Sequence, residues 1–283
     1  MLFPATFPFP MRVVRGPMAQ ARLSPTVRAP RRCRHRRSPK AGDFLLRTKS
    51  NPAKRSQRPL TYSHLGESVE RVLPQPEWET CVVAASGPSL TAEAAEAIAA
   101  SGLPVLAVND AYKRLPSAAA LYACDDMWWI ERAGAADFAG ERWSSTGRPG
   151  RFRHNDKSRV QKRYGVRLIF GEDGAGFSTD PETIHYGSNS GFQAVNLALH
   201  FGARHILLIG FDMQGTHFFG EHKPPLRNTG SYVSFIRAFD VAAKKLSPDI
   251  EIVNTSPVSK LNCFPKVPLD AAIAQACRRR LAA

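Results

Sequence analysis

Residues 79–102 read ETCVVAASGPSLTAEAAEAIAASG, and this run carries the strongest fold signal in the chain. The nearly continuous apolar stretch 79–85 predicts a short strand that is buried on both faces, as in a parallel sheet. The alanine-rich stretch 91–101, followed by Gly102, predicts a helix with a glycine stop. A strand, a tight turn and a helix in this order are typical of a βα unit.

The turn between this strand and this helix is a candidate ligand site. In an open parallel sheet, ligands lie beyond the carboxyl ends of the strands. Gly87 would let the backbone approach a ligand closely, and free N–H groups at the helix start favour a phosphate. We therefore predict that the turn, made of Ser86, Gly87, Pro88 and Ser89, binds a phosphate-bearing nucleotide. A plain helix cap by Ser89 or Thr91 is the alternative.

The rest of the chain repeats this pattern. Short apolar runs at 105–108, 119–124, 166–170, 205–209 and 250–253 predict further strands, and helical patterns cover 127–136, 189–201, 231–246 and 268–281. Residues 140–163, which are polar and rich in Gly and Arg, and residues 211–230 are interpreted as loops. Strands that alternate with helices predict an α/β, Rossmann-like fold with a doubly wound, mainly parallel sheet. We expect one such domain over residues 75–283.

The basic character of the chain lies at its start. The formal net charge is +15, with 39 Lys and Arg against 24 Asp and Glu. Residues 1–60 hold 15 of the basic side chains and one acidic side chain, Asp43, which leaves 24 basic and 23 acidic side chains in residues 61–283. A nearly neutral body lacks the positive potential that a nucleic-acid-binding surface needs. If the protein contacts nucleic acid at all, we expect it to do so only through the tail.

This tail, residues 1–60, is rich in Arg and Pro and has no periodic apolar spacing, so we predict that it is disordered. Three interpretations of it stay open. The tail is an acid-poor organelle-targeting segment, a nucleic-acid-binding arm, or no functional element at all. In the last case translation begins downstream, at Met11, Met18 or later.

Composition also bears on location. No apolar run approaches the roughly 18 residues that a membrane span needs. The cysteines show no CxxC spacing; they are Cys33, Cys81, Cys124, Cys263 and Cys277. Cys81 and Cys124 lie in apolar runs, where a buried reduced thiol is the ordinary outcome. We expect no structural disulfide and a cytoplasmic protein.

Polar residues follow two more of the predicted strands. Asn109 comes directly after the second strand, and Asp125 with Asp126 after the third. Because the carboxyl ends of parallel strands meet at one edge of a sheet, we expect Asn109 and Asp125 to line a crevice together with Gly87. Adjacent carboxylates at a strand end point to opposite sides, so the acidic pair does not imply a shared metal ion.

The helix predicted over 189–201 opens with small polar residues. Hydroxyl and amide side chains at a helix N-terminus, together with the free backbone N–H groups, can donate hydrogen bonds to an anion. An ordinary helix cap would account for one of these residues but not for the whole run. We predict that Asn189, Ser190 and Gly191 contact the nucleotide.

The loop after the strand 205–209 holds Asp212, His217 and His222. Imidazole titrates near neutral pH, so the two histidines are candidates for a general base, although a lone histidine is more often structural. We predict that Asp212 lies at the nucleotide site and that His222 or His217 removes a proton. No third ligand stands at a recognisable spacing, which disfavours zinc.

Six motifs follow one another along the chain: SGPSL, AVN ending at Asn109, SNSG, ILLIGFD ending at Asp212, THFFGEH ending at His222, and VNTSP ending at Pro257. In this order they resemble the bacterial sialyltransferases of glycosyltransferase family 42. They also resemble the related domain family of the MptE-like 6-hydroxymethylpterin diphosphokinases, and phage and prophage proteins with a segment like Leu121–Trp129. The resemblance covers about residues 79–262.

The resemblance implies a Rossmann-like fold and a nucleotide site at the matching positions. The turn 86–89 matches the nucleotide-contacting turn of the sialyltransferases, with Ser86 in place of an asparagine. Asn109 matches an asparagine that contacts the nucleotide, and Ser190 a serine near the carboxylate of the donor.

The resemblance also suggests a catalytic base. His222 matches the catalytic histidine of the sialyltransferases with one residue inserted before it, so His217 is the alternative. Gly187 stands where that family has an arginine, so the resemblance does not extend to sialic acid as the donor sugar.

Three functions follow from these observations. The first is a transferase that moves a sugar from a nucleotide-sugar to a glycan or another acceptor hydroxyl, with a histidine base and no required metal. The second is an MptE-like diphosphokinase in which Asp125, Asp126 or Asp212 holds Mg²⁺ beside ATP. The third is a phage-derived nucleotide-binding protein without turnover. A homo-oligomer is compatible with each function.

Overall fold

The computed structural model describes residues 62–64, 67–69, 72–75, 77–146, 157–226 and 231–282. The chain divides into two compact units, residues 1–55 and 56–283, and all described residues belong to the second. The predicted disorder of the tail therefore lies outside the described residues. The second unit begins with two short strands, β1 (Tyr62–His64) and β2 (Glu67–Val69), which pair antiparallel.

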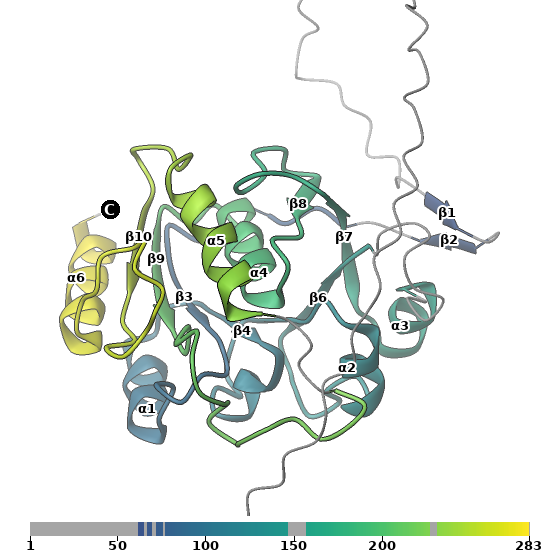
Figure 1. Cartoon of the computed structure of the whole chain (residues 1–283), viewed down its shortest axis with the longest axis horizontal. Helices are drawn as coiled ribbons and strands as arrows, with labels where there is room; N and C mark the ends of the chain where they lie inside the picture. Colours follow the sequence, from purple (N-terminus) through teal and green to yellow (C-terminus); the bar gives the residue numbers. More distant parts are fainter. Residues whose placement is uncertain are drawn as a thin grey trace, which may run out of the picture. The chain divides into compact units, whose positions relative to one another are not determined.

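An eight-stranded parallel sheet forms the centre of this unit (Figure 1). Its strand order is β10-β9-β3-β4-β5-β6-β7-β8, and every neighbouring pair is parallel. The strands are β3 (Thr80–Ala84), β4 (Val105–Val108), β5 (Ala120–Tyr122), β6 (Glu141–Ser145), β7 (Arg167–Glu172), β8 (Thr183–His185), β9 (His205–Ile209) and β10 (Glu251–Asn254). The predicted Rossmann-like α/β fold is confirmed.

Helices cover both faces of the sheet. They are α1 (Ala92–Ser101), α2 (Asp126–Glu131), α3 (Lys157–Tyr164), α4 (Ser190–His200), α5 (Tyr232–Ala243) and α6 (Leu269–Ala282), with the 3-10 turn η2 (Asn109–Lys113) after β4. Within the described residues, no helix has both the length and the apolar composition for a membrane crossing.

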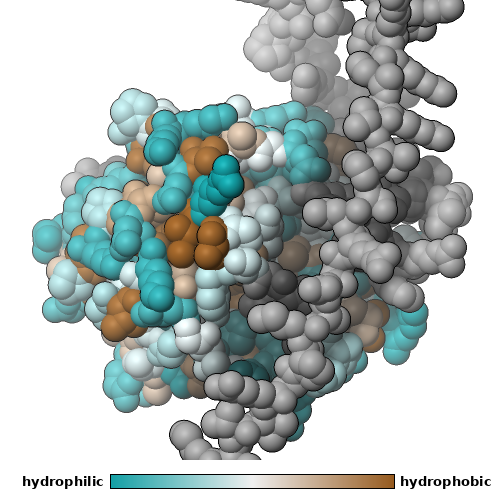
Figure 2. Space-filling model, viewed as in Figure 1, coloured by the Kyte–Doolittle hydropathy of each residue, from teal (hydrophilic) through white to brown (hydrophobic). Residues whose placement is uncertain are grey.

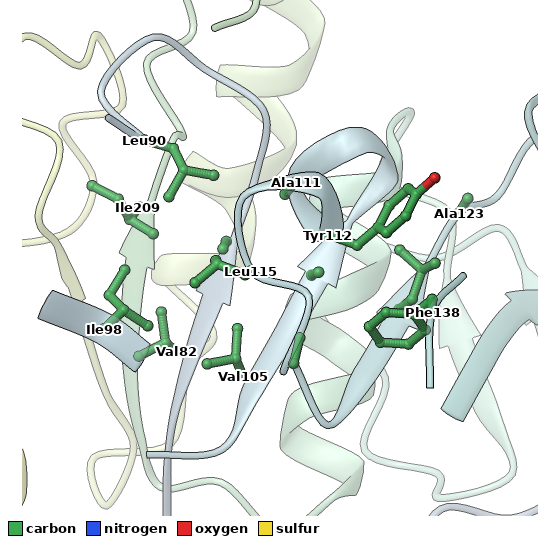
Figure 3. Packing of buried hydrophobic residues seen from close by; sticks show 14 of the residues in the cluster. Val82, Leu90, Ile98, Val105, Ala111, Tyr112, Leu115, Ala123, Phe138 and Ile209 are labelled. Carbon is green, nitrogen blue, oxygen red and sulfur yellow. The ribbon is translucent and has the colours of Figure 1, made fainter. Parts of the chain in front are cut away.

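Alternating side chains of each strand face two separate cores, because successive residues of a strand point to opposite sides. Val82 packs in the core that contains residues of α1, α2, α3 and α6, and Figure 3 shows it beside Ile98 of α1. Its neighbour Val83 packs in the core that contains residues of α4 and α5. This two-sided burial explains why the central strands β3, β4 and β5 are nearly all apolar in sequence.

The sheet changes its winding direction beside β3. From β3 the chain adds β4 to β8 outward on one side, and α4 then brings it back to β9 on the other side of β3. The pairing of β3 and β9 continues beyond the strands, where Ala85 N–H donates to Ile209 O (2.8 Å) and Gly87 N–H to Gly210 O (2.9 Å). A crevice at such a switch point is the usual ligand site of an open α/β sheet.

Three predictions about elements are corrected. The region 140–163, predicted as a loop, contains β6 and most of α3, and β8 was not predicted at all. The helix predicted over 127–136 ends at Glu131. The missed elements have mixed polarity because they bury polar side chains, which find hydrogen-bond partners elsewhere in the fold, beside apolar ones such as Trp143 and Val160. In β6, for example, Ser145 donates a hydrogen bond to Gln193 Oε1 (3.0 Å).

The described cysteines are Cys81, Cys124, Cys263 and Cys277, and all are free thiols. Burial raises the pKa of the Cys81 thiol to about 12. Cys33 lies outside the described residues.

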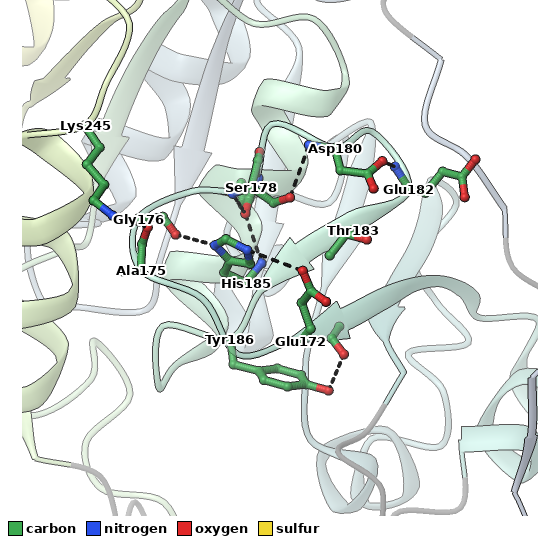
Figure 4. Close-up of polar contacts among 12 residues, drawn as sticks. Glu172, Ala175, Gly176, Ser178, Asp180, Glu182, Thr183, His185, Tyr186 and Lys245 are labelled. Carbon is green, nitrogen blue, oxygen red and sulfur yellow. Dashed lines mark hydrogen bonds and ion pairs between the residues drawn. The ribbon is translucent and has the colours of Figure 1, made fainter. Parts of the chain in front are cut away.

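A polar loop between β7 and β8 fixes the segment that leads into α4. The buried amide of Asn196 in α4 accepts hydrogen bonds from the backbone of Ser178 (2.8 Å) and His185 (3.1 Å). Figure 4 shows the same loop, in which His185 Nδ1 contacts Gly176 O at 2.8 Å. The Tyr186 hydroxyl donates to Gly171 O (2.7 Å). These contacts position residues 187–191 at the start of α4.

Phe239 of α5 is fully buried, with ring centroids 5.2–6.3 Å from four other aromatic rings: Phe177, Phe192, Phe211 and Phe264. We expect Phe239→Ala to lower the free energy of unfolding by about 3–5 kcal/mol, because it leaves a cavity between α4, α5 and the sheet. Urea unfolding measures the change. The matched control on the same helix is Val233→Ala, at a side chain that is 75% exposed. A similar loss in both variants would contradict the packing described.

Candidate functional site

A cleft of about 680 Å³ opens at the carboxyl edge of the sheet, around the switch point between β3 and β9. Ligand pockets typically measure about 300–1,000 Å³. Its walls come from the ends of β3, β4, β5 and β9, from the first turns of α2, α4 and α5, and from the loop after β9. Segments distant in sequence therefore share one cavity.

Ten of the residues predicted for the site line this cleft: Ser86, Gly87, Asn109, Asp125, Asn189, Ser190, Gly191, Asp212, His217 and His222. Pro88 and Ser89 of the first turn do not line it.

Ser89 instead forms hydrogen bonds that fix the residues at the base of the cleft, which we call its floor. Its backbone N–H and its hydroxyl both donate to Asp212 Oδ2, at 3.0 and 2.9 Å. Its Oγ also lies 2.8 Å from Ser256 Oγ, and both hydroxyl oxygens accept from Gly210 N–H at 3.1 Å. This network joins the ends of β3, β9 and β10. Asp212 is thereby buried, and among the described residues its Oδ1 has no hydrogen-bond partner.

At Gly87 and Gly210, in the floor of the cleft, neighbouring atoms leave no room for a side chain. A Cβ atom on Gly87 would lie 2.1 Å from Asp212 Oδ2 and 2.4 Å from Gly210 O. Gly210 has a φ of 74°, and a Cβ there would lie 2.1 Å from Ala85 O. Two backbones therefore approach each other at a distance that only glycine permits.

Three residues with side chains hold left-handed backbone conformations at the cleft: Asn109 (φ 51°), Ser188 (φ 70°) and Met213 (φ 53°). Such conformations are uncommon outside glycine and asparagine, and they concentrate at ligand sites. Each stands where the chain leaves a strand end or enters a helix, so the strain shapes the cleft itself.

The start of α4 faces the cleft with its backbone. Asn189 caps the helix, since its Oδ1 accepts from Phe192 N–H at 2.8 Å. Ser190 Oγ accepts from Cys124 N–H (3.1 Å) and lies 3.0 Å from Cys124 Sγ. The Ser190 hydroxyl therefore anchors α4 to the end of β5. The first-turn N–H groups, at the positive end of the helix dipole, remain the natural anion donors.

The adjacent carboxylates of Asp125 and Asp126 have separate surroundings. Asp125 lines the cleft and caps α2 by accepting from Met127 N–H (3.0 Å). Asp126 is buried and forms an ion pair with Lys157 Nζ at 2.5 Å. Lys157 also donates to Cys124 O (2.7 Å), which fastens α3 to β5. Within the described ranges, no three His, Cys, Asp or Glu side chains gather as a metal site would require.

The two histidines of the loop lie against each other. The rings of His217 and His222 are 4.5 Å apart, and His217 stacks on Phe219 at 5.0 Å. The backbone N–H of Phe218 donates to Ser86 O (2.9 Å), which ties this loop to the turn after β3. The cleft therefore brings the histidines beside the predicted nucleotide turn.

Both imidazoles favour the neutral form. Burial lowers the pKa of His222, and burial followed by the charge of His222 lowers the pKa of His217. In the described part of the chain, the buried Nδ1 of His222 has no hydrogen-bond partner. A neutral imidazole at pH 7 can accept a proton from a ligand.

An ionic cluster around the buried carboxylate of Asp110 lies near the histidines, and sequence reasoning missed its role. Asp110 accepts from Trp128 Nε1 (3.1 Å) and from Arg132 Nε (2.7 Å) and Nη2 (3.1 Å), and its Oδ1 lies 2.6 Å from Lys113 Nζ. Burial raises the pKa of Asp110, but these donors outweigh burial and hold it at about 2. The negative charge of Asp110 raises the pKa of both histidines, which partly offsets the lowering of the pKa that burial causes. Arg132 lies 22 residues away, so only the folded chain reveals the pair.

We expect Asp110→Asn to lower the free energy of unfolding by about 2–3 kcal/mol at pH 7, because it removes the buried charge that Arg132 and Lys113 stabilise. The folded pKa of about 2 lies below the unfolded value of about 3.9. The stabilisation is therefore present above about pH 4 and is lost as the pH falls toward 2. Urea unfolding across this range measures the difference between wild type and variant, which should shrink on acidification.

The matched control is Asp249→Asn, because Asp249 forms an exposed ion pair with Arg204. It should leave the free energy of unfolding nearly unchanged at any pH, because an exposed ion pair contributes little to stability. A cost of Asp110→Asn that stays constant down to the lowest pH at which the chain is folded would contradict the charged state of Asp110.

Comparisons of the chain with protein-family models, with curated proteins and with solved structures gave no match.

Proposed function

We propose that the protein transfers a sugar from a nucleotide-activated donor to an acceptor hydroxyl. One observation carries the proposal: the N-terminus of α4 and the neutral pair His217 and His222 open onto the same cleft at the switch point of the sheet. A helix N-terminus suits a phosphate, and a neutral imidazole suits a proton acceptor. Group transfer from a phosphate leaving group can use the first to stabilise the leaving group and the second to accept the proton of the acceptor.

In the proposed reaction, the acceptor oxygen attacks the anomeric carbon of the donor. The bond from that carbon to the phosphate oxygen breaks, and the nucleotide leaves with the bonding electron pair. The hydroxyl proton passes to the imidazole of His222, or to His217 if that ring lies nearer the acceptor. The backbone N–H groups in the first turn of α4, such as that of Gly191, would stabilise the charge on the leaving phosphate.

The resemblance to glycosyltransferase family 42 supports this proposal, since the residues that carry it include cleft-lining positions on β3, β4, α4 and the histidine loop. The donor sugar is left open, because Gly187 replaces the arginine of that family. The nucleotide is also left open and is to be identified by measurement.

The alternative diphosphokinase would need carboxylates free to hold Mg²⁺ beside ATP. Asp126 is engaged by Lys157, and Oδ2 of Asp212 by Ser89. Asp125 lines the cleft but caps α2. These three groups do not form a magnesium site as they stand, so the sugar transferase is the better-supported function.

A nucleotide conjugate of the correct type is expected to raise the melting temperature of the full chain. At a concentration 100 times Kd, binding stabilises the folded state by about 2.7 kcal/mol. Thermal-shift measurements with CMP, UDP, GDP and ATP conjugates identify the nucleotide, with and without Mg²⁺. A shift seen only with ATP and Mg²⁺ would favour the diphosphokinase instead.

Substituting Asn109 by glycine tests the predicted contact without backbone strain, since Asn109 has a φ of 51° that glycine also adopts. Asn109→Gly should reduce the ligand-induced shift while leaving the melting temperature of the free chain nearly unchanged. The control is Ala133→Gly, at a residue with a φ of 47° outside the cleft, which should keep the full shift.

Removal of the base is expected to lower donor turnover by about 100-fold or more. The variants are His222→Ala and His217→Ala, and nucleotide release in the presence of acceptor is the readout. The thermal shift with nucleotide should persist in both variants. His205→Ala is the control, because His205 lies at the opposite end of β9. Unchanged donor turnover in both cleft variants would contradict the mechanism with a histidine base.

The pH dependence separates a base from a structural histidine. Burial lowers the pKa of His222 below the ordinary histidine value of about 6.5. kcat/KM should therefore fall as the pH drops, with a midpoint below that value, and the acid limb should disappear in the variant that lacks the base. Nucleotide binding without any turnover would indicate the non-catalytic binding protein.

A further inference from the structure

Two residues that line the cleft each carry a buried polar atom without a hydrogen-bond partner in the described part of the chain. The atoms are Oδ1 of Asp212 and Nδ1 of His222. A buried polar atom without a partner costs free energy of folding, so native proteins seldom keep one that serves no purpose. His222 has a part in the proposed reaction, whereas nothing in that reaction accounts for the unpartnered oxygen of Asp212.

The carboxyl group of Asp212 is held in one orientation beside the turn after β3. Its Oδ2 accepts from the backbone N–H (3.0 Å) and the hydroxyl (2.9 Å) of Ser89. A Cβ atom on Gly87 would lie 2.1 Å from the same oxygen, so the backbone of the turn passes directly beside the carboxyl. Asp212 is 1% exposed. A ligand that sits on the turn at Gly87 therefore comes next to this carboxyl group.

The lining of the cleft supplies few donors for this oxygen. The Tyr232 hydroxyl donates to Gly215 O at 3.1 Å, and the Gln214 amide donates to Val258 O. Among the described residues that line the cleft, none is Lys or Arg. The ligand is therefore the natural source of a hydrogen-bond donor for Oδ1.

We propose that Oδ1 of Asp212 accepts a hydrogen bond from a hydroxyl group of the ligand, and that this contact makes the cleft selective for ligands with that hydroxyl. The kind of ligand rests on the proposed transferase function, because a nucleotide-sugar carries hydroxyl groups on its ribose and on the transferred sugar. In dinucleotide-binding α/β folds a carboxylate accepts from a ribose hydroxyl in the same way. A ligand without the hydroxyl would bind and leave the buried oxygen unsatisfied.

The first experiment tests the ribose as the source of the hydroxyl. Isothermal titration calorimetry with the full chain compares UDP, CDP, GDP and ADP with their dideoxy counterparts, which lack both ribose hydroxyls. We expect the diphosphate that binds most tightly to lose about tenfold or more in affinity when the ribose hydroxyls are removed.

The second experiment tests the transferred sugar as the source. It compares the glucose conjugates of the same diphosphates with conjugates of the monodeoxyglucoses, each of which lacks one hydroxyl. If the hydroxyl belongs to the sugar, the dideoxy nucleotides bind normally and one monodeoxyglucose conjugate loses about tenfold or more in affinity.

The variant Asp212→Asn separates this residue from the rest of the cleft. Its side-chain carbonyl can keep both hydrogen bonds from Ser89, while its amide nitrogen places a donor where Oδ1 is an acceptor. We expect the preference for the hydroxyl to fall to about threefold or less. The preference is a ratio of affinities for two ligands with the same phosphates, so a change in charge at residue 212 affects both alike.

The matched control is Asp249→Asn, because Asp249 precedes β10 at the edge of the sheet opposite the cleft. This variant should keep the full preference. The coloured surface in Figure 2 is mainly hydrophilic, with apolar residues in small separate groups, so weak binding of nucleotides to the outer surface is the main competing signal. Such binding would not depend on Asp212.

If Asp212→Asn does not fold, a measurement on the wild-type chain replaces it. The NMR signal of the Asp212 carboxyl carbon should move further with the hydroxyl ligand than with its deoxy counterpart. Equal movement of this signal with both ligands would overturn the proposal.

Equal affinities of the hydroxyl and deoxy ligands in both experiments would also overturn it, even if the chain turns over a nucleotide-sugar. The same holds for a preference that survives Asp212→Asn in full, because another residue would then hold the hydroxyl. Conversely, a preference that depends on Asp212 in a chain without donor turnover would contradict the transferase and leave the hydroxyl site standing. If none of the probes binds, both proposals are wrong.

Discussion

The cleft depends on one buried carboxylate. Asp212 accepts two hydrogen bonds from Ser89, whose hydroxyl meets Ser256 and Gly210. A polar group is costly to bury unless hydrogen bonds compensate it, so this contact holds three strand ends in a single arrangement. The close approach of the backbones that results excludes every side chain at Gly87. The floor of the cleft is thus set before any ligand arrives.

Two of the buried carboxylates near the cleft are paired within the protein, whereas Asp125 and Asp212 line the cleft, and its described lining contains no Lys or Arg. Asp110 is neutralised by Arg132 and Lys113, and Asp126 by Lys157. In the described part of the chain, the cleft therefore offers dipoles and neutral imidazoles rather than free cations. A phosphate bound there would rely on the N–H groups at the start of α4, which are fixed by folding and need no rearrangement. This agrees with the nearly neutral charge of the body in sequence.

The regular part of the fold was predictable because its signals are local. The strand and helix on either side of Gly87 were predicted to within one or two residues, since continuous apolar runs and a glycine stop act over a few positions. β6 was missed because its buried serines are satisfied by distant partners such as Gln193. A polar strand of this kind has no periodic apolar signal, and its burial depends on neighbours that the chain supplies later.

At the site, the sequence alone established which strand ends carry polar residues, and therefore that Asn109, Asp125 and the histidine loop would meet at one edge of a parallel sheet. Their individual roles came from tertiary structure. Ser89 does not line the cleft but holds Asp212 in place by hydrogen bonds, and Asp110 is the buried carboxylate near the histidines. The physical reason is distance along the chain: a hydrogen bond between residues 123 positions apart leaves no local pattern, whereas burial of a strand does.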